Sequence, residues 1–261
     1  MATETLLVGC GRLGGAILSG WRLSGAVSMS QLAILTPSEK PIAMTAAGEG
    51  ARLNPDGALT SVRSVVLAVK PARWREAAAS LTTRLSSDAI IVSVMAGVST
   101  ASMAQAFDGR PIARVMPTTA VSTARGVATC FAGIDHAREA VSRMFRPIAT
   151  LVWVDDEALI NVATALSGSG AAYAYAFVRD LAAAGERRGL SSEQALLLAR
   201  MTVSGALSRL DASAEVQPLI DEVASPGGTT ESGLRVLEPS LSQLLDATVA
   251  AALERAGELA D

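Results

Sequence analysis

A glycine-rich turn near the start of the chain places the strongest constraint on its fold. The apolar run TLLV at 5–8 leads directly into GCGRLG at 9–14, and the apolar segment AIL at 16–18 follows. This is the order strand, G-x-G-x-x-G loop, helix, in which the glycines permit a tight turn, close approach of a pyrophosphate and close packing of helix on strand. The unpaired first N–H groups of such a helix attract phosphates, so the motif predicts a dinucleotide site. Three glycines after a strand can also form a simple tight turn.

The periodicity of the remaining chain predicts an α/β domain followed by an all-helical one. Short β-branched runs alternate with longer segments of helical period up to residue 155, as in a mostly parallel sheet. We therefore expect a Rossmann-type dinucleotide-binding domain over 1–155 and an all-helical dimerisation and substrate domain over 156–261. The expected strands are 5–8, 32–35, 64–69, 90–94, 112–116, 127–131 and 151–154, and the expected helices are 14–24, 38–48, 71–85, 99–107, 135–148, 159–166, 171–187, 192–210 and 241–259.

Composition limits the partners of the chain. A net charge of −3 and a pI near 5.4 lack the basic balance that nucleic-acid binding needs, so we expect a small-molecule substrate and no nucleic acid. The chain has no leader pattern and no run of about eighteen apolar residues, which predicts a cytoplasmic protein that does not enter a membrane. Half of the residues are hydrophobic and the mean hydropathy is +0.36, so we expect apolar surface buried between copies in a homo-oligomer.

The end of the second expected strand bears on the choice of cofactor. Proteins of this fold that prefer NAD place an acidic residue there, about 20 residues after the glycines, to bind the ribose hydroxyls. Here the segment at 35–40 reads LTPSEK, which offers Thr36, Ser38 and Lys40 to a 2′-phosphate and favours NADPH. Alternatively, Ser38 caps the next helix and Lys40 is a solvated charge. Glu39 offers a carboxylate to a ribose, so NADH remains possible.

Five motifs in order resemble the pyrroline-5-carboxylate reductase family over nearly the whole chain. They are GCGRLG at 9–14, AVKP at 68–71, MPTT at 116–119, SGSG at 167–170 and SPGGTT at 225–230, the last continuing as ESGLRVLE to residue 238. The resemblance implies NAD(P)H-dependent reduction of a cyclic imine acid to L-proline, the last step of proline biosynthesis, by homodimers that often assemble into decamers. The family usually has Asn and Pro where this chain has Thr118 and Ala120, and Pro at Ala171, so the substrate preference is open.

The motifs and the strand ends give a set of expected cofactor residues. Lys70 ends the expected central strand, where it would face the cofactor or the substrate carboxylate; the alternative is a solvent-facing lysine beside Pro71. Asn54 lies in ordinary turn composition, NPDG, which we favour over contact with adenosine. The predicted cofactor-binding residues are Gly9, Gly11, Arg12, Leu13, Gly14, Thr36, Ser38, Lys40, Ala68, Val69, Lys70, Met116 and Pro117.

The SPGGTT segment carries the prediction for the substrate. A helix that begins near Thr229 leaves its first N–H groups unpaired, and with two preceding glycines the amides of Gly228, Thr229 and Thr230 could hold a carboxylate. By itself the hexapeptide is typical of a helix–helix turn, but the matching family motif favours binding. A protonated imine mainly needs orientation and one hydroxyl at the ring nitrogen. The predicted catalytic residues are Thr230, Ser225 and Lys70, and the predicted substrate-binding residues are Gly227, Gly228, Thr229 and Thr230.

Missing residue types argue against other dehydrogenase classes. Cys10 and Cys130 are the only cysteines and His136, expected on the surface, is the only histidine, so neither a zinc site nor a histidine base is predicted. No lysine follows Lys70, whereas β-hydroxyacid dehydrogenases place a catalytic lysine in the helical domain. Two alternatives remain: a reductase of a six-membered cyclic imine acid, and a catalytically silent nucleotide-binding paralogue.

Overall fold

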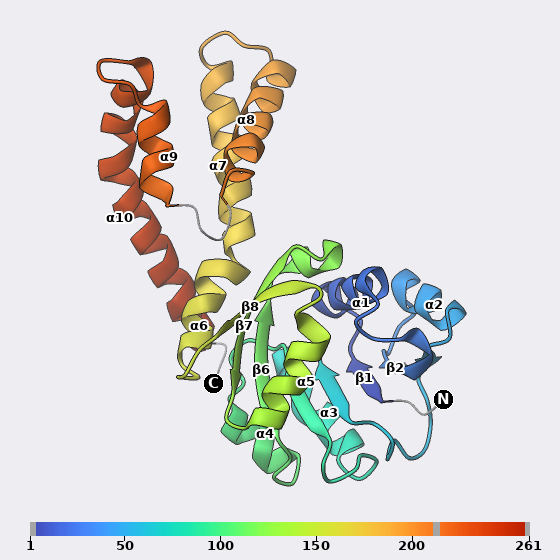
Figure 1. Cartoon of the computed structure of the whole chain (residues 1–261). Helices are drawn as coiled ribbons and strands as arrows, with labels where there is room; N and C mark the ends of the chain where they lie inside the picture. Colours follow the sequence, from blue (N-terminus) through green and yellow to red (C-terminus); the bar gives the residue numbers. More distant parts are fainter. Residues whose placement is uncertain (1–3, 211–214, 259–261) are drawn as a thin grey trace. The chain divides into compact units, whose positions relative to one another are not determined.

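A computed structural model of the chain describes residues 4–210 and 215–258 and divides them into two compact units (Figure 1). The first unit runs to Gly168 and also includes the end of the last helix from Ala252, and the second unit is Ser169–Ala251. The first unit extends beyond the last strand of the sheet, which ends at Trp153, because the helix at Leu159–Ala163 still packs on the sheet.

The first unit is built on an eight-stranded sheet in the order β3-β2-β1-β4-β5-β6-β7-β8. All neighbouring strands are parallel except β6 and β7, so the expectation of a mostly parallel sheet is confirmed. The central strands are buried along their length, as expected for a sheet covered on both faces. The strands are β1 (Thr5–Val8), β2 (Leu32–Leu35), β3 (Arg52–Leu53), β4 (Ser64–Leu67), β5 (Ile90–Ser93), β6 (Ile112–Pro117), β7 (Gly126–Ala132) and β8 (Ala149–Trp153).

Helices cover both faces of this sheet (Figure 1). One face packs against α1, α2 and α5, and the other packs against α3 and α4. The helices of the first unit are α1 (Arg12–Ser24), α2 (Pro41–Gly48), α3 (Trp74–Leu81), α4 (Thr100–Ala106), α5 (Asp135–Phe145) and α6 (Leu159–Ala163), with the short 3-10 turns η1 (Met29–Gln31), η2 (Pro71–Arg73) and η3 (Thr119–Thr123) and a π-helical turn η4 (Thr164–Gly168).

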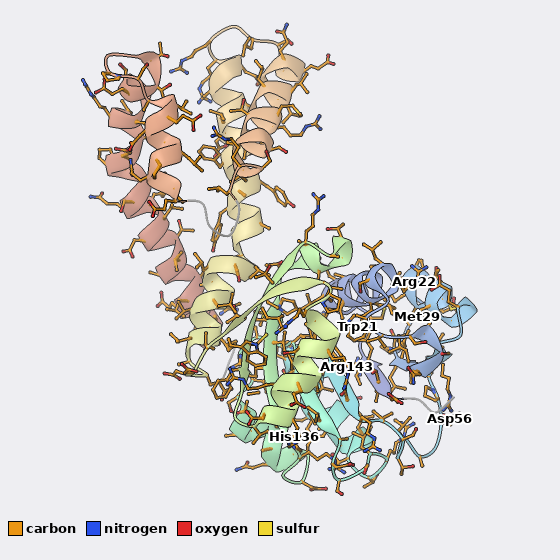
Figure 2. The ribbon with its side chains drawn as sticks, in the orientation of Figure 1. Trp21, Arg22, Met29, Asp56, His136 and Arg143 are labelled. Carbon is orange, nitrogen blue, oxygen red and sulfur yellow. The ribbon has the colours of Figure 1, made fainter. Side chains whose placement is uncertain are left out.

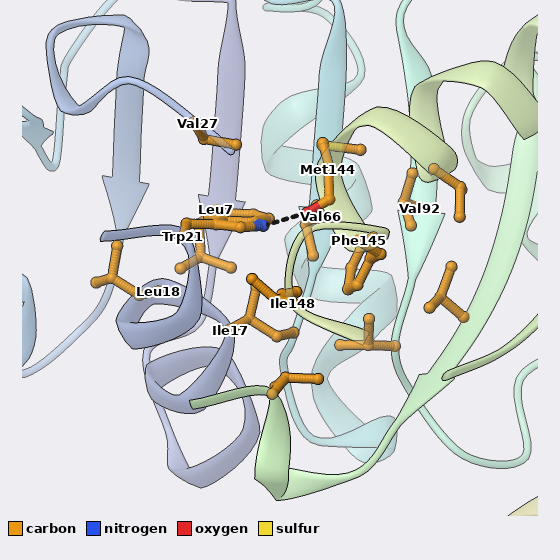
Figure 3. Close-up of a cluster of buried hydrophobic side chains, with 14 of the residues drawn as sticks. Leu7, Ile17, Leu18, Trp21, Val27, Val66, Val92, Met144, Phe145 and Ile148 are labelled. Atoms are coloured by element: carbon orange, nitrogen blue, oxygen red, sulfur yellow. Dashed lines mark hydrogen bonds between the residues drawn. The ribbon is translucent and has the colours of Figure 1, made fainter. Parts of the chain in front are cut away.

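A fully buried tryptophan joins two of these helices over the sheet (Figure 3). Trp21 of α1 donates its indole N–H to the carbonyl oxygen of Met144 on α5 over 2.9 Å. Its ring meets that of Phe145 edge-on, with 6.2 Å between centroids. Because the buried indole N–H has a partner, the large ring adds apolar burial without an unsatisfied donor. This contact fixes α1, and with it the glycine loop that precedes α1, against the rest of the unit.

The second unit consists only of helices within its described residues. They are α7 (Gly170–Glu186), α8 (Ser192–Leu207), α9 (Val216–Val223) and most of α10 (Thr229–Glu258). Its buried core is small, with Ala182, Ala195 and Ala199 packed against Val178 between α7 and α8. Many large apolar side chains of these helices are exposed, including Tyr175, Leu196 and Met201. Such surface is typical of helices that pack against another copy.

The structure confirms the expected strands and corrects several helix limits. The helix expected over 38–48 begins only at Pro41, because Pro37 and Pro41 both restrict the preceding backbone. The helix expected over 71–85 is a 3-10 turn followed by α3, which ends at Leu81. Helix α9 was not expected, and the helix expected from 241 begins already at Thr229 and continues through Pro239. Among the described residues, no helix combines the length and apolar character needed to cross a bilayer.

Candidate functional site

The glycine loop links β1 to α1 in a conformation that two of its glycines make possible. Gly9 has a φ of +93°, and a Cβ there would lie 2.6 Å from the carbonyl oxygen of Ala68. A Cβ on Gly14 would lie 2.1 Å from the carbonyl oxygen of Gly9. Real Cβ atoms do not approach that closely, so both glycines are required for helix, loop and strand β4 to pack together.

Gly11 has a different environment, which fits the approach of a ligand. A Cβ on Gly11 would meet no heavy atom within 4 Å, so packing within the protein does not require glycine there. Gly11 is the residue before α1, and no side chain caps the first amides of this helix. An uncapped helix N-terminus behind an open glycine is the arrangement that binds phosphate groups.

The loop opens into a cavity of about 710 Å³ at the carboxyl ends of β1, β2 and β4. Ligands of open α/β sheets bind at such strand ends. Eight of the predicted cofactor residues line this cavity, namely Gly9, Gly11, Thr36, Ser38, Lys40, Ala68, Val69 and Lys70. The remaining five do not: Arg12, Leu13 and Gly14 lie in the first turn of α1, and Met116 and Pro117 are buried at the end of β6. Their assignment to the cofactor stays a prediction.

The segment after β2 is fixed by Asn54 rather than by a helix cap. The backbone N–H of Thr36 donates to Asn54 Oδ1 over 2.8 Å, and the Thr36 hydroxyl donates to the carbonyl oxygen of Ser38 over 3.1 Å. Since Thr36 is buried and already donates its hydroxyl proton, it shapes the loop, and that proton is not free for a ligand. Ser38 and Lys40 line the cavity beside it. Ser38 does not cap α2, which begins three residues later, so the expectation of a Ser38 cap is wrong, whereas nothing decides between a solvated Lys40 and a ligand-binding one. Glu39 does not line the cavity.

Cys10 and Lys40 lie near each other at the cavity wall. Burial raises the pKa of the Cys10 thiol above its ordinary value, and the positive charge of Lys40 acts in the opposite direction. The thiol therefore stays protonated near neutral pH and acts as a small packing group. His136 is exposed on α5, as expected, and Arg143 lies further along the same helix (Figure 2).

An ion pair between a buried arginine and a partly buried glutamate lies just before α6 and was missed from the sequence. Arg114 of β6 donates through Nη1 to Glu157 Oε1 over 3.1 Å. Glu157 also accepts from the backbone N–H and the hydroxyl of Thr100 at the start of α4, over 2.8 and 2.6 Å. Arg114 lies between apolar residues in a strand, and nothing in the local pattern indicated a partner 43 residues away.

The SPGGTT segment of the second unit forms a tight turn before α10. Gly227 has a φ of +73°, and the N–H of Gly228 donates to the carbonyl oxygen of Ser225 over 3.0 Å. The Gly228 amide is thus engaged within the turn, contrary to the expectation that it is available to a carboxylate. The amides of Thr229 and Thr230 lie in the first turn of α10, before the intrahelical hydrogen bonds begin.

The chain provides a carboxylate of its own at this turn. Glu231 Oε2 accepts from the N–H of Gly227 over 2.6 Å, and Arg235 donates to Glu231 Oε1 over 2.9 Å. The Gly227 hydrogen bond, with a smaller contribution from Arg235, lowers the pKa of Glu231 below its ordinary value. Glu231 is therefore ionised near neutral pH, and Gly227 is not a free amide donor in this conformation.

The strand, G-x-G-x-x-G loop and helix, with a cavity at the strand ends, define a Rossmann-type nicotinamide-dinucleotide oxidoreductase joined to a helical unit. Residues 5–97 match the family model described as NADP oxidoreductase, coenzyme F420-dependent, and residues 157–259 match pyrroline-5-carboxylate reductase dimerisation. The chain belongs to the pyrroline-5-carboxylate reductase family. It is 32% identical to the Pseudomonas aeruginosa pyrroline-5-carboxylate reductase over 97% of this chain and 96% of that protein.

Solved structures agree with this assignment. A pyrroline-5-carboxylate reductase from Coxiella burnetii superposes with a TM-score of 0.89, at 31% identity and covering 99% of both chains. The Plasmodium falciparum pyrroline carboxylate reductase, solved with NADP bound, gives a TM-score of 0.85 at 25% identity, covering 99% of this chain and 98% of that one. The helical unit is accordingly a dimerisation domain, and the chain forms oligomers through it.

Proposed function

We propose that this protein reduces 1-pyrroline-5-carboxylate to L-proline with NADPH, the last step of proline biosynthesis. The observation that carries the proposal is the near full-length similarity to proteins named for this reaction, together with the cavity behind Gly11. The cofactor supplies a hydride to the imine carbon when bound. The residues of this chain have to bind the dinucleotide, orient the ring and place a proton at the ring nitrogen.

The cavity of the first unit fits a dinucleotide with a 2′-phosphate. The uncapped amides of α1 behind Gly11 suit the pyrophosphate. Ser38 and Lys40 line the region beyond β2 where a 2′-phosphate would lie, whereas Glu39 does not line the cavity. The Plasmodium relative with NADP bound agrees with NADPH as the preferred cofactor, and NADH is the weaker alternative. Lys70, in the segment between β4 and η2, would contact the phosphates or the substrate carboxylate.

In the second unit, Thr229 and Thr230 are the proposed substrate-binding residues. Their amides offer two donors to the substrate carboxylate, and the approach beside Gly227 is open, because a Cβ there would meet no heavy atom within 4 Å. The hydroxyl of Thr230 would hydrogen-bond the ring nitrogen and direct its proton. Ser225 would support the turn, because its backbone and side chain surround Gly228. The exposed apolar helices suggest that a second copy covers this unit and completes the site, in a homodimer or a larger assembly such as a decamer.

The direct test is the oxidation of NADPH in the presence of 1-pyrroline-5-carboxylate, followed at 340 nm. Steady turnover would support the proposal and rule out a catalytically silent paralogue. Faster turnover of the six-membered imine acid would instead identify a reductase of different ring size. The positions Thr118, Ala120 and Ala171, where the family usually differs, make this comparison necessary.

A substitution at Thr230 tests the assignment of its hydroxyl. Thr230→Ala should lower kcat by about tenfold or more, while the dissociation constant of NADPH stays the same. Thr230→Ser keeps a hydroxyl and should retain most of the activity, and Thr229→Ala is a control for the neighbouring exposed threonine. Full activity of Thr230→Ala would remove this hydroxyl from the mechanism.

A further inference from the structure

The part of the cavity wall that follows β4 in the chain carries an ion pair that no motif predicted. It is formed by η2 and α3, which contribute Arg73, Glu76, Ala77 and Ser80 to the lining. Arg73 donates to the carboxylate of Glu76 through Nε over 3.1 Å and through Nη2 over 3.0 Å. Both side chains are more than half exposed, at 58% and 71%.

The side chains that line the cavity carry more positive than negative charges. Among the residues that line it, the cations are Lys40, Lys70 and Arg73, and Glu76 is the single carboxylate. Arg73 is also the single arginine in this set. A guanidinium presents a planar pair of donors that matches a phosphate, which the lysine point charges do not.

We propose that Arg73 is a second cation for the 2′-phosphate of the cofactor, and that Glu76 limits the preference for NADPH by competing for it. The inference rests on the proposed use of NADPH. An exposed ion pair between residues three apart contributes little to stability, so the guanidinium can leave Glu76 at little cost for a doubly charged phosphate. Glu76 then remains at the cavity wall as an uncompensated negative charge, which opposes the phosphate but not a ribose hydroxyl.

Lys40 and Arg73 therefore come from different segments of the cavity wall and have different neighbours. Lys40 follows β2 and lies near the Cys10 thiol. This thiol carries no charge near neutral pH, so it does not compete with a phosphate for Lys40. Arg73 follows β4 and is already paired with the carboxylate of Glu76 when no ligand is bound. Loss of either cation should weaken binding of the phosphate, whereas loss of Glu76 should strengthen it.

The experiment measures binding of 2′,5′-ADP and 5′-AMP to the full-length protein by calorimetry, because these two ligands differ only in the 2′-phosphate. Arg73→Ala should weaken 2′,5′-ADP about tenfold and change 5′-AMP less than about twofold, as expected for loss of one charge-assisted pair. Glu76→Gln should tighten 2′,5′-ADP about threefold. Arg75→Ala is the matched control, because Arg75 stacks on Trp74 and does not line the cavity.

The same titrations separate failure of this inference from failure of the proposed cofactor. If Lys40→Ala selectively weakens 2′,5′-ADP but Arg73→Ala does not, the role of Arg73 is refuted while NADPH preference stands. Equal losses for both ligands in Arg73→Ala would show stacking on adenine and would also refute it. If the unmodified protein binds 2′,5′-ADP no more tightly than 5′-AMP, the preference for NADPH itself is wrong.

Discussion

Replacing Glu157 should destabilise the first unit more than replacing its partner Arg114. The guanidinium is only 4% exposed and the carboxylate 22%, and the N–O distance is 3.1 Å. At an effective dielectric constant of about 20, two unit charges at this distance attract by about 5 kcal/mol before the cost of desolvation is counted. Glu157→Gln leaves Arg114 as a buried cation without a carboxylate, while Nε and Nη2 of Arg114 already have no hydrogen-bond partner among the described residues. We expect a loss of about 3 kcal/mol or more.

Arg114→Met should cost less, about 1 to 2 kcal/mol, because Glu157 is left with other stabilising contacts. Its carboxylate keeps the N–H and hydroxyl of Thr100 and remains in reach of water. The double variant Arg114→Met with Glu157→Gln should be more stable than Glu157→Gln alone, since no buried charge remains. The expected order of the three free energies of unfolding follows from whether a buried charge is left without a partner. This order is a sharper test than any single value.

Urea unfolding followed by tryptophan fluorescence measures these differences. All three tryptophans, at positions 21, 74 and 153, belong to the first unit, so the signal reports on that unit. Protein concentration has to be fixed, because oligomerisation stabilises the folded chain by mass action. Arg63→Met, which breaks an exposed ion pair with Asp88, is the control and should cost less than about 1 kcal/mol. An Arg114→Met variant as unstable as Glu157→Gln would refute the reasoning.

Three further outcomes are expected. Gly11→Ala should keep the melting temperature but abolish tight NADPH binding, whereas Gly14→Ala should lower the free energy of unfolding by about 3 kcal/mol, because only the Cβ on Gly14 would collide with the backbone. Scanning calorimetry measures the stability of each variant, and titration with NADPH measures its binding. Burial raises the pKa of Cys130 to about 12, so above about pH 9 this thiol ionises in the unfolded chain but not in the folded one, and the free energy of unfolding should fall by about 1.4 kcal/mol per pH unit. Denaturant titrations of Cys130→Ala should show a weaker dependence on pH. Leu196→Asp on α8 should reduce the mass seen by light scattering toward the 26.7 kDa of one chain, whereas Leu23→Asp on α1, at a side chain that is also exposed, should not.

The sheet could be predicted well because its signal is local. Each central strand is a short apolar run bounded by polar or glycine residues, and burial on both faces makes such runs unambiguous. The helices were predicted less well where prolines occur. Pro41 marks the start of α2 because proline suits a first helical turn, but Pro239 lies inside α10, where local rules predict a break.

The cavity at the strand ends was also predicted in part from local signals, since eight of the thirteen expected cofactor residues line it. The glycine loop and the residues after β2 lie at strand ends, and parallel strands bring their carboxyl ends to one edge of the sheet. Arg73 and Asn54 were not assigned to the cavity, because their role depends on how loops from different strands fold over the same edge. Arg114 and Glu157 are separated by 43 residues and meet because α6 packs on the sheet.

The turn before α10 shows why a motif predicts donors better than it predicts which of them are free. The glycines of SPGGTT identify the amides at the helix start, since any helix leaves its first N–H groups unpaired. Which of these amides remain available depends on the acceptors nearby. In the structure the Ser225 carbonyl oxygen and the Glu231 carboxylate accept from Gly228 and Gly227. Glu231 was visible in the sequence three residues into the helix, where such a residue often returns to cap the turn. A carboxylate at this place leaves Thr229 and Thr230 as the donors that a substrate could use, and the positive charge of Arg235 offsets the repulsion that Glu231 would otherwise exert on a second carboxylate.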